Sequence, residues 1–493
     1  MNSWASLTLL FAAGCTMTPA MPSASTVAPS VTTLFISADL RGYIGPCGCS
    51  ENMQGGIARA AFQVAKAHDE GHPVVFVDSG NALFSSPTIA PEAVPQQERK
   101  AKALAEAFKA MGLAGRSVGP LDNARGEVFR ASLGLKELTP IQLVTPGVAV
   151  VTAANLAGVA PLAAEARSQG ARFVVALVQQ SFSATVPAIR SEALIGSADL
   201  LVAAQASDEL STEDNKLVGQ ALRVAQVQSK GRSLLRVDVT QRGPDAKVQW
   251  LRSNTDQERE LSALAERIEL LRAQVNEPML NEELKALRKG KLEEIIARKE
   301  ALAARPLEAP TIGAWASARF IELEASFEQL PSVKEIVTSY DRDVGLLNVA
   351  WAKAHGRDCE APTAASPGYV GTSICIACHP AAGAFWQTSK HALAYQTLER
   401  AGKNNHLDCV GCHVTGWQKP GGVCRIDKAA GRGEVGCESC HGAGSGHVAK
   451  PTKATIVSAV GATTCVGCHD RENAPHFSFE AYLEKVVGPG HGR

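Results

Sequence analysis

Strand and helix patterns alternate over residues 32–255. Helical periodicity covers, for example, 56–69, 97–112 and 182–194. Short apolar runs rich in β-branched residues separate these segments and predict strands: TTLFISADL, PVVFVDS, GVAVVTAA, RFVVALVQ and ADLLVAAQ. Three later runs, ALRVAQVQS, SLLRVDVT and AKVQWLRS, predict a closing antiparallel meander. The whole pattern is typical of a layered α/β domain.

A different periodicity begins at residue 256. Apolar residues recur in alternating three- and four-residue steps, as in a coiled-coil seam, at Leu261, Leu264, Ile268, Leu271 and Val275. After Pro278 the apolar positions resume at Leu284, Leu287, Leu292, Ile295 and Ile296. We expect an antiparallel helical hairpin over 256–304, acting as a spacer or docking arm; a single solvated helix is the alternative. Residues 313–356 are also predicted helical, which makes 256–360 a helical connector ahead of a Pro/Ala/Ser linker at 361–367.

The last stretch, residues 368–493, is rich in Gly, Cys and His and has few long apolar runs. Such a composition cannot form a hydrophobic core from protein alone, so another group must fill the interior. The full chain of 493 residues is too long for one core, and we expect two or three domains in a multidomain protein.

The formal charges of the chain sum to zero, so nothing indicates a nucleic-acid partner. No apolar run beyond the N-terminus is long enough to cross a bilayer.

The chain has 13 cysteines, and ten of them lie after residue 355. Eight belong to four Cys-x-x-Cys-His motifs: Cys375/Cys378/His379, Cys409/Cys412/His413, Cys437/Cys440/His441 and Cys465/Cys468/His469. This spacing allows two thiols to form thioethers with the vinyl groups of a porphyrin while the adjacent His binds iron. Zinc sites also use Cys-x-x-Cys pairs but do not require the following His. The motifs therefore predict four haem c groups, close enough together for rapid electron exchange.

In order along the chain, GYVGTSICIACHPAAGAFWQTSKHALAYQTL, LDCVGCHVTGWQKPGG, EVGCESCHGAGSGHV and TTCVGCHDRENAPHFSFEAYLEKV cover residues 368–493. This stretch resembles the tetrahaem cytochrome family of nitrifying bacteria, whose founding member accepts electrons from hydroxylamine oxidoreductase. The resemblance implies four c-type haems, mostly with two His ligands, and leaves room for one five-coordinate iron, which would be the candidate catalytic centre. It does not carry over the partner, because this chain has a large additional N-terminal region.

The second axial ligands must come from the remaining histidines of this region. Three of them match family positions, namely His391, His447 and His476. His406 and His491 are further candidates, with an exposed loop histidine as the alternative for both. Two His ligands leave no open site on iron and favour electron transfer over substrate chemistry.

The N-terminal region carries ISADLRGYIGP, GGIARAA and VVFVDSGNAL. These segments resemble the start of the bacterial 5′-nucleotidase metallophosphoesterases. Matched to that family, Asp39 stands at the first metal carboxylate, Arg41 replaces a His, and Asn81 stands at the bridging carboxylate. The later His-bearing motifs read Val118-Gly119-Pro120-Leu121, Val178-Gln179-Gln180 and Ala203-Ala204-Gln205. We expect the fold to be kept, the metal site to be lost, and no hydrolysis of phosphate esters.

Residues 1–14 are typical of a secretion signal, and Ala12-Ala13-Gly14-Cys15 resembles a bacterial lipobox. Cys15 would then be lipidated, with 16–31 as a flexible tether, although MNSW lacks the usual Lys or Arg. An apolar N-terminal helix with an incidental cysteine is the alternative. Cys47 and Cys49 could form a strained, redox-active disulfide, bind a metal or a partner, or be buried or paired elsewhere. Cys359 and Cys424 could pair or remain free, and we assign them no role.

We therefore expect a membrane-anchored lipoprotein facing the periplasm or cell exterior. It would transfer electrons between unidentified redox partner proteins, with the N-terminal domain as scaffold or docking module. Two enzymatic alternatives remain: a multihaem oxidoreductase acting on a small nitrogen or sulfur substrate at an open haem, and an active phosphohydrolase fused to a cytochrome.

Overall fold

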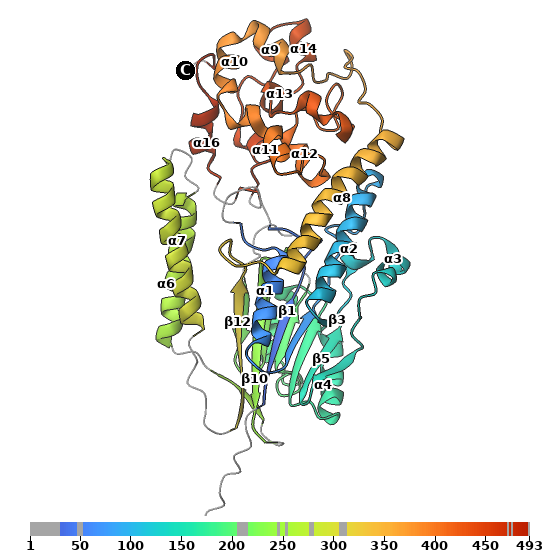
Figure 1. Cartoon of the computed structure of the whole chain (residues 1–493), viewed down its shortest axis with the longest axis vertical. Helices are drawn as coiled ribbons and strands as arrows, with labels where there is room; N and C mark the ends of the chain where they lie inside the picture. The colour runs from blue at the N-terminus through green and yellow to red at the C-terminus, as the bar shows by residue number, and fades with distance from the viewer. Residues whose placement is uncertain are drawn as a thin grey trace, which may run out of the picture.

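The computed structural model describes residues 30–46, 53–204, 215–243, 247–251, 255–275, 281–304, 313–470, 473–474 and 477–491. Figure 1 shows an α/β region, a helical region stacked on one end of it, and a pair of long helices alongside. Cys15, Cys47, Cys49 and His476 lie outside the described residues, so the expectations for them stay predictions.

The α/β region contains two six-stranded sheets. The first has the order β11 (Val248–Trp250), β12 (Ala314–Glu322), β10 (Ser233–Gln241), β1 (Ser30–Ser37), β2 (Val74–Asp78) and β3 (Leu113–Arg116). The second has the order β4 (Ile141–Thr145), β5 (Val148–Ala153), β6 (Phe173–Val178), β7 (Leu200–Ala203), β9 (Arg223–Gln226) and β8 (Lys216–Gly219). In the first sheet β1 pairs parallel with β2 and antiparallel with β10.

Helices cover the outer face of each sheet. The first sheet packs against α1 (Ile57–His68), α2 (Val94–Ala110) and α8 (Pro331–His355), and the second against α4 (Val159–Ser168) and the short α5 (Phe182–Thr185). Strands buried on both faces read as continuous apolar runs. In β6, Phe173 and Val175 enter the core between the sheets, whereas Val174 and Ala176 face the outer helices. The predicted α/β layers are thus present.

The remaining helices are short. They are α3 (Gly126–Ser132), α9 (Thr372–Cys378), α10 (Pro380–Gln387), α11 (Ala394–Arg400), α12 (Leu407–His413), α13 (Cys437–His441), α14 (Ser445–Ala449), α15 (Ala462–Cys465) and α16 (Phe479–Val486). Turns of 3-10 helix are η1 (Pro91–Ala93), η2 (Pro120–Asn123), η3 (Leu156–Gly158), η4 (Val186–Arg190), η5 (Lys390–Leu393), η6 (Ile426–Arg432) and η7 (Lys453–Thr455).

Three predicted elements differ in the structure. The predicted closing meander does not form, because β9 joins the second sheet while β10 and β11 belong to the first. Residues 314–322 form strand β12 instead of helix, since Ala314 and Ala316 alternate into the core between the sheets. The predicted helix over 182–194 is broken into α5 and η4, where Pro187 lacks the N–H that a longer helix needs.

The predicted pair of helices over 256–304 is present as α6 (Thr255–Val275) and α7 (Glu282–Ala303). Their seam contains Leu264, Ile268, Leu271 and Val275 of α6 and Leu292, Ile295 and Ile296 of α7. Leu284 and Leu287, also predicted for the seam, are 37% and 70% exposed. Because β11 and β12 pair in parallel on either side of the hairpin, it is an insertion within the first sheet.

In the described part of the helical C-terminal region a small apolar cluster is formed by Tyr395, Val410, Val414, Val423, Ile426 and Ala429 together with Ala352 of α8. A disulfide joins Cys359, between α8 and the linker, to Cys424, which settles the pairing left open by the sequence. Among the described residues no helix is both long and apolar enough to cross a membrane.

Candidate functional site

The first three Cys-x-x-Cys-His motifs lie on or at the end of the short helices α9, α12 and α13, and the fourth begins at the last residue of α15 and continues in the hydrogen-bonded turn that follows. Residues three apart in a helix share a face, so one turn presents both thiols of a motif on the same side. In the first motif the helix ends at Cys378, and His379 leaves it with φ −120°. None of the eight motif cysteines forms a disulfide within the described chain.

Contacts between thiols give the spatial order of the motifs. Cys375 of the first motif contacts Cys437 of the third, and Cys412 of the second contacts Cys468 of the fourth. Cys440 of the third motif interacts electrostatically with Cys465 of the fourth. The motifs therefore follow one another in space in the order first, third, fourth, second.

Two motif histidines face a histidine from elsewhere in the region. The rings of His379 and His447 have centroids 6.4 Å apart, and their planes are inclined by 25° to each other. The rings of His391 and His469 lie 6.1 Å apart at 41°. Burial lowers the pKa of both His391 and His469, which favours the neutral imidazole that binds metals.

This spacing fits two-sided ligation of one iron. Imidazole nitrogens that bind a metal from opposite sides each lie about 2 Å from it, with each ring centre roughly 1 Å further out, so the centroids lie about 6 Å apart. Apolar side chains beside the motifs are also well exposed: Ile374 is 45%, Leu393 44% and Val466 47% exposed. The thiols, the ring pairs and these apolar neighbours fit a c-type haem.

Backbone carbonyls hold several of these imidazoles by Nδ1. The Nδ1–H of His413 donates to the carbonyl of Ala394 at 2.7 Å, and that of His441 donates to Val457 at 2.6 Å. His447 donates from Nδ1 to the carbonyl of Thr452 at 3.2 Å. Such a bond fixes the tautomer and leaves Nε2 as the nitrogen that can bind metal.

The other predicted ligands are placed differently. His406 is 3% exposed, and its Nε2 lies 2.9 Å from the carbonyl of Asp341 on α8. Its ring also meets Tyr340 edge to face. The structure thus gives His406 a partner on α8 and no histidine ring opposite it within the described residues. His491 is exposed beside Phe385 of α10.

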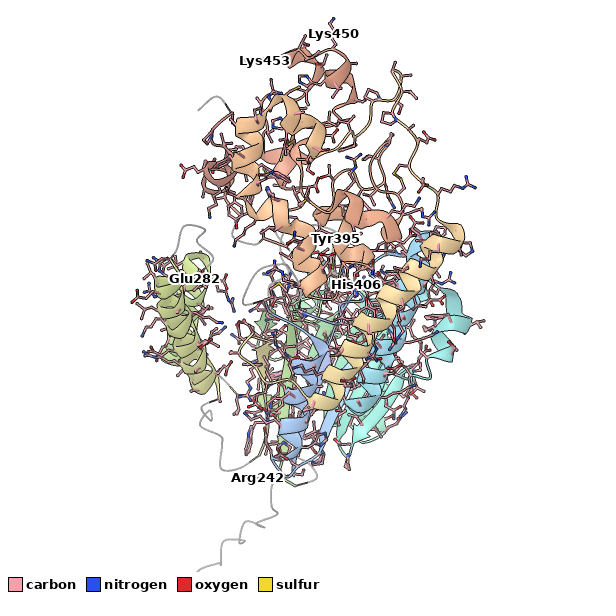
Figure 2. The ribbon with its side chains drawn as sticks, turned by 45° about the horizontal axis from the view of Figure 1, so that its top comes forward. Arg242, Glu282, Tyr395, His406, Lys450 and Lys453 are labelled. Carbon is pink, nitrogen blue, oxygen red and sulfur yellow. A yellow bond between two sulfur atoms is a disulfide. The ribbon has the colours of Figure 1, made fainter. Side chains whose placement is uncertain are left out.

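His406 belongs to the contact between the two regions (Figure 2). The Nδ2 amide of Asn348 on α8 donates to Gln96 on α2 at 2.7 Å and to the carbonyl of Asn405 at 2.8 Å. Lys100 of α2 pairs with Asp408 at 2.6 Å. Burial alone would raise the pKa of Asp408, but the charge and hydrogen bond of Lys100, together with His406 and Gln96, lower it below its ordinary value. The second motif, which starts at Cys409, is thereby fixed to the α/β region.

Two buried residues that link motifs were not recognised in the sequence. Glu438, inside the third motif and 1% exposed, accepts from the backbone N–H groups of Gly371 and Gly444, both at 2.7 Å. Thr415, fully buried, accepts from Gly436 N and donates to the carbonyl of Glu434. Glu438 could have been found from the sequence, because it is an acidic residue between two motif cysteines. No feature of the sequence indicated the role of Thr415.

In the region that resembles a phosphoesterase, the residues at the expected metal positions have unusual backbone conformations. Asp39, Arg41 and Asn81 have φ values of 49°, 50° and 56°, in the left-handed region that non-glycine residues rarely adopt. They follow the carboxyl ends of β1 and β2. Sequence reasoning placed the altered metal positions at these residues, and the structure brings Asp39 and Asn81 onto adjacent loops, where Asp39 N donates to Gly80 O.

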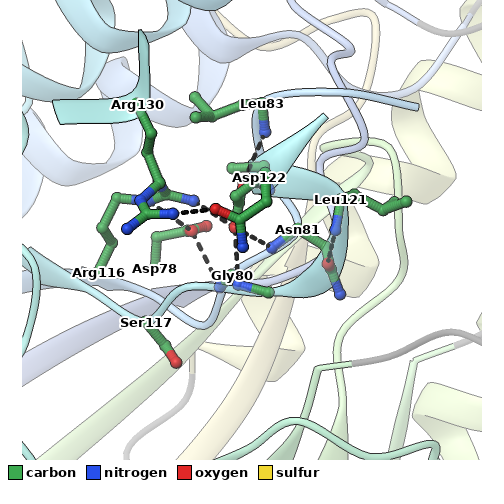
Figure 3. Close-up of polar contacts among 12 residues, drawn as sticks. Asp78, Gly80, Asn81, Leu83, Arg116, Ser117, Leu121, Asp122 and Arg130 are labelled. Atoms are coloured by element: carbon green, nitrogen blue, oxygen red, sulfur yellow. Dashed lines mark hydrogen bonds and ion pairs between the residues drawn. The ribbon is translucent and has the colours of Figure 1, made fainter. Parts of the chain in front are cut away.

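A protein ion network lies beside them (Figure 3). The carboxylate of Asp122 accepts four backbone N–H bonds of 2.8–3.0 Å from Asn81, Ala82, Leu83 and Gly119. It also pairs at 2.6 Å with Arg116, whose side chain is fully buried. A Cβ at Gly119 would overlap the Asn81 side chain, so the close approach requires glycine.

Asp78 completes the network. It accepts from Ser37 Oγ at 2.7 Å and from Gly80 N at 3.0 Å, and lies 3.8 Å from Arg116. Burial raises the pKa of Asp78 to about 7 despite the attraction of Arg116. Gln179, at one of the expected His positions, donates to Ser117 Oγ. Within the described residues no group of three or more His, Cys, Asp or Glu side chains could hold a metal ion.

Known proteins resemble the two regions separately. Residues 374–442 match the model of the family described as cytochrome c554 and c-prime. Cytochrome c-554 of Nitrosomonas europaea is 33% identical over 96 residues, which is 16% of this chain and 41% of that protein. The chain thus spans less than half the length of this curated relative.

Solved structures similar to the chain include a putative 5′-nucleotidase of Staphylococcus aureus, with 12% identity, a TM-score of 0.40, and coverage of 76% of this chain and 66% of that one. A 5′-nucleotidase precursor of Thermus thermophilus has 12% identity, a TM-score of 0.38, and coverage of 76% and 68%. Both TM-scores are low, so the description of the α/β region rests on the order of its own strands.

Sequence similarity and the site geometry agree for the C-terminal region. The match begins just before Cys375 and extends past His441, so it contains the first three motifs. The C-terminal region is therefore similar to the cytochrome c554 family, and this similarity implies c-type haem as its cofactor.

Proposed function

We propose that this protein transfers electrons through four covalently attached c-type haems held by its C-terminal region. One observation supports this most directly: His379 and His469 each face a second imidazole at about the spacing of two ligands on one iron. A c-type haem, when bound, supplies an iron that alternates between two oxidation states without making or breaking covalent bonds.

The chain's own residues then have defined roles. Each cysteine pair would anchor one porphyrin edge, and each motif His would provide an axial nitrogen. His447 would be the second ligand to the iron of the first motif, and His391 to that of the fourth. The Nδ1 bonds of His413, His441 and His447 to carbonyls keep their rings oriented.

The motif order supports a continuous path for electrons. One end, the second motif, lies against α2 and α8 of the α/β region through Lys100 and Asp408. The other end, the first motif, is reached through the third and fourth. We propose that the α/β region serves as scaffold or docking module and hydrolyses no phosphate esters, because the fixed cation of Arg116, paired with Asp122 and 3.8 Å from Asp78, lies beside the expected metal positions and repels metal ions.

A second candidate function is oxidoreductase chemistry on a small nitrogen or sulfur substrate at an open iron. The contact of His406 Nε2 with the Asp341 carbonyl favours it, since this histidine is then engaged away from His413 and His441. We further propose export and lipidation of Cys15. Cys15→Ser should then move the protein from the membrane fraction to the soluble fraction; unchanged membrane association would count against lipidation.

The test is expression of the full chain in a host with haem-attachment machinery. We expect a denatured chain that keeps its colour and carries the mass of four haems. His447→Ala should convert one low-spin iron to high-spin and increase carbon monoxide binding. His406→Ala, the matched control, should leave the ferric spectrum unchanged. A colourless chain that binds zinc would refute the central proposal, and a spectral change in the control variant alone would reassign the ligand.

A further inference from the structure

One end of the C-terminal region is remote from the α/β region. It follows α14 and includes Lys450 and Lys453, which Figure 2 shows at the extremity of the molecule, far from His406. All seven residues of 448–454 (VAKPTKA) are exposed, and we call them the 448–454 surface. Val448 is 53% exposed.

The charge on this surface has one sign. No acidic residue occurs between Glu438, which is buried, and Asp470. Within the described chain neither Lys450 nor Lys453 makes an ion pair, whereas Lys428 of the same region pairs with Asp358 at 2.6 Å. Two lysines therefore lie among the exposed apolar residues Val448, Pro451 and Ala454 without a carboxylate to compensate their charge.

The same segment supports the candidate haem ligands. The carbonyl of Thr452, within the 448–454 surface, accepts from Nδ1 of His447, whose ring faces His379. Three residues beyond that surface, the carbonyl of Val457 accepts from Nδ1 of His441. A protein bound here would lie next to groups that hold two of the proposed irons. At the opposite end the second motif is covered by α2 and α8.

We propose that the 448–454 surface is the docking site for a redox partner protein that presents carboxylates around an apolar centre. This rests on the proposed electron-transfer function. His379 and His447 would hold the nearest haem, which would exchange one electron with the partner's redox centre, so that one centre would be oxidised as the other is reduced and no covalent bond would change. Opposite charge at the rim steers such encounters, and apolar side chains supply the central contact.

The experiment uses full-length haem-loaded protein, reduced and then mixed rapidly with small oxidants of opposite charge: tris(oxalato)cobaltate(III), an anion, and hexaamminecobalt(III), a cation. Reversing both lysines in K450E/K453E should slow oxidation by the anion about tenfold at low salt and accelerate oxidation by the cation. The difference should shrink at high salt, where charges are screened. The control K334E/K353E makes the same charge change on exposed positions of α8 and should alter either rate less than about twofold.

Equal effects in the two double variants, or none in K450E/K453E, would show that net charge governs the reaction and would overturn the docking site. In a Cys15→Ser background, which removes the proposed lipid anchor, co-sedimentation with phosphatidylglycerol vesicles that K450E/K453E abolishes and K334E/K353E does not would reassign the surface to a membrane and also overturn the proposal. Haem content and mass are measured first on each protein. A chain without haem refutes the proposed function, whereas a haem-loaded chain with the wrong kinetics refutes only the docking site.

Discussion

The interiors of the α/β region and of the C-terminal region are filled in different ways. In the α/β region, apolar side chains fill cores on both faces of two sheets, and Arg116 pairs with the buried carboxylates of Asp78 and Asp122. In the described part of the C-terminal region the apolar side chains form a small cluster, while the motif cysteines and histidines face one another across short helices. The described interior of the first region is filled by its own side chains, whereas the sequence similarity of the second region implies a c-type haem.

The largest expected effect tests this contrast directly. Exported to an oxidising compartment without haem attachment, the chain should keep a protease-resistant α/β region while residues 368–493 are degraded. The reason is that too little apolar surface is buried there to offset the ordering of the backbone. Limited proteolysis with mass spectrometry measures it, with the haem-loaded chain as the control. Equal resistance of 368–493 with and without haem would remove the distinction between the regions.

A buried charge network should make Arg116 critical to the α/β region. Arg116→Met would leave Asp122 buried without its cation, and we expect a loss of about 3–5 kcal/mol in the free energy of unfolding. Arg125→Met, at a partly exposed pair with Glu98, should cost less than about 1 kcal/mol. Denaturation followed by circular dichroism measures both. Similar small losses would mean that the network is not the structural element that we infer.

The sequence predicted the elements that show a repeated motif or a regular pattern of apolar residues. The runs in β1 and β6 gave their strands because both faces of each are buried, and Cys-x-x-Cys-His fixed the motif residues by covalent chemistry. The Arg116–Asp122 pair was not predicted, because the backbone N–H groups that donate to Asp122 are brought together only by the fold. Strand β12 was missed because its partner β10 lies far from it along the chain, before the helical hairpin.

Contacts between the regions should show an intermediate effect. Asn348→Ala removes the amide that bridges Gln96 and the Asn405 carbonyl. The carbonyl loses this donor, whereas Gln96 Oε1 still accepts from Leu407 N, and the loss of two hydrogen bonds should cost about 1–3 kcal/mol. Thermal unfolding of the haem-loaded protein, followed at a haem band, should report it. Lys353→Ala, at an exposed position of the same helix, is the control. If both variants unfold alike, the two regions are joined by the linker and disulfide rather than by this network.

The last effect depends on pH and concerns Asp78, the carboxyl that the α/β region buries at a cost. Its pKa is raised to about 7 in the folded protein, against about 3.9 in the unfolded chain. Between these values the folded protein binds the proton that the unfolded chain has released, so this group's contribution to stability falls as pH rises from about 4 to about 7. Asp78→Asn cannot ionise, and its melting temperature relative to the parent protein should therefore rise over the same range. Asp358, exposed just after α8, has a pKa lowered by its hydrogen bond to Lys428, so Asp358→Asn should lose stability relative to the parent protein only above the lowered pKa, with the change confined to below about pH 4 and no trend between pH 4 and 7. Parallel trends in the two variants would mean that the burial of Asp78 does not govern its ionisation.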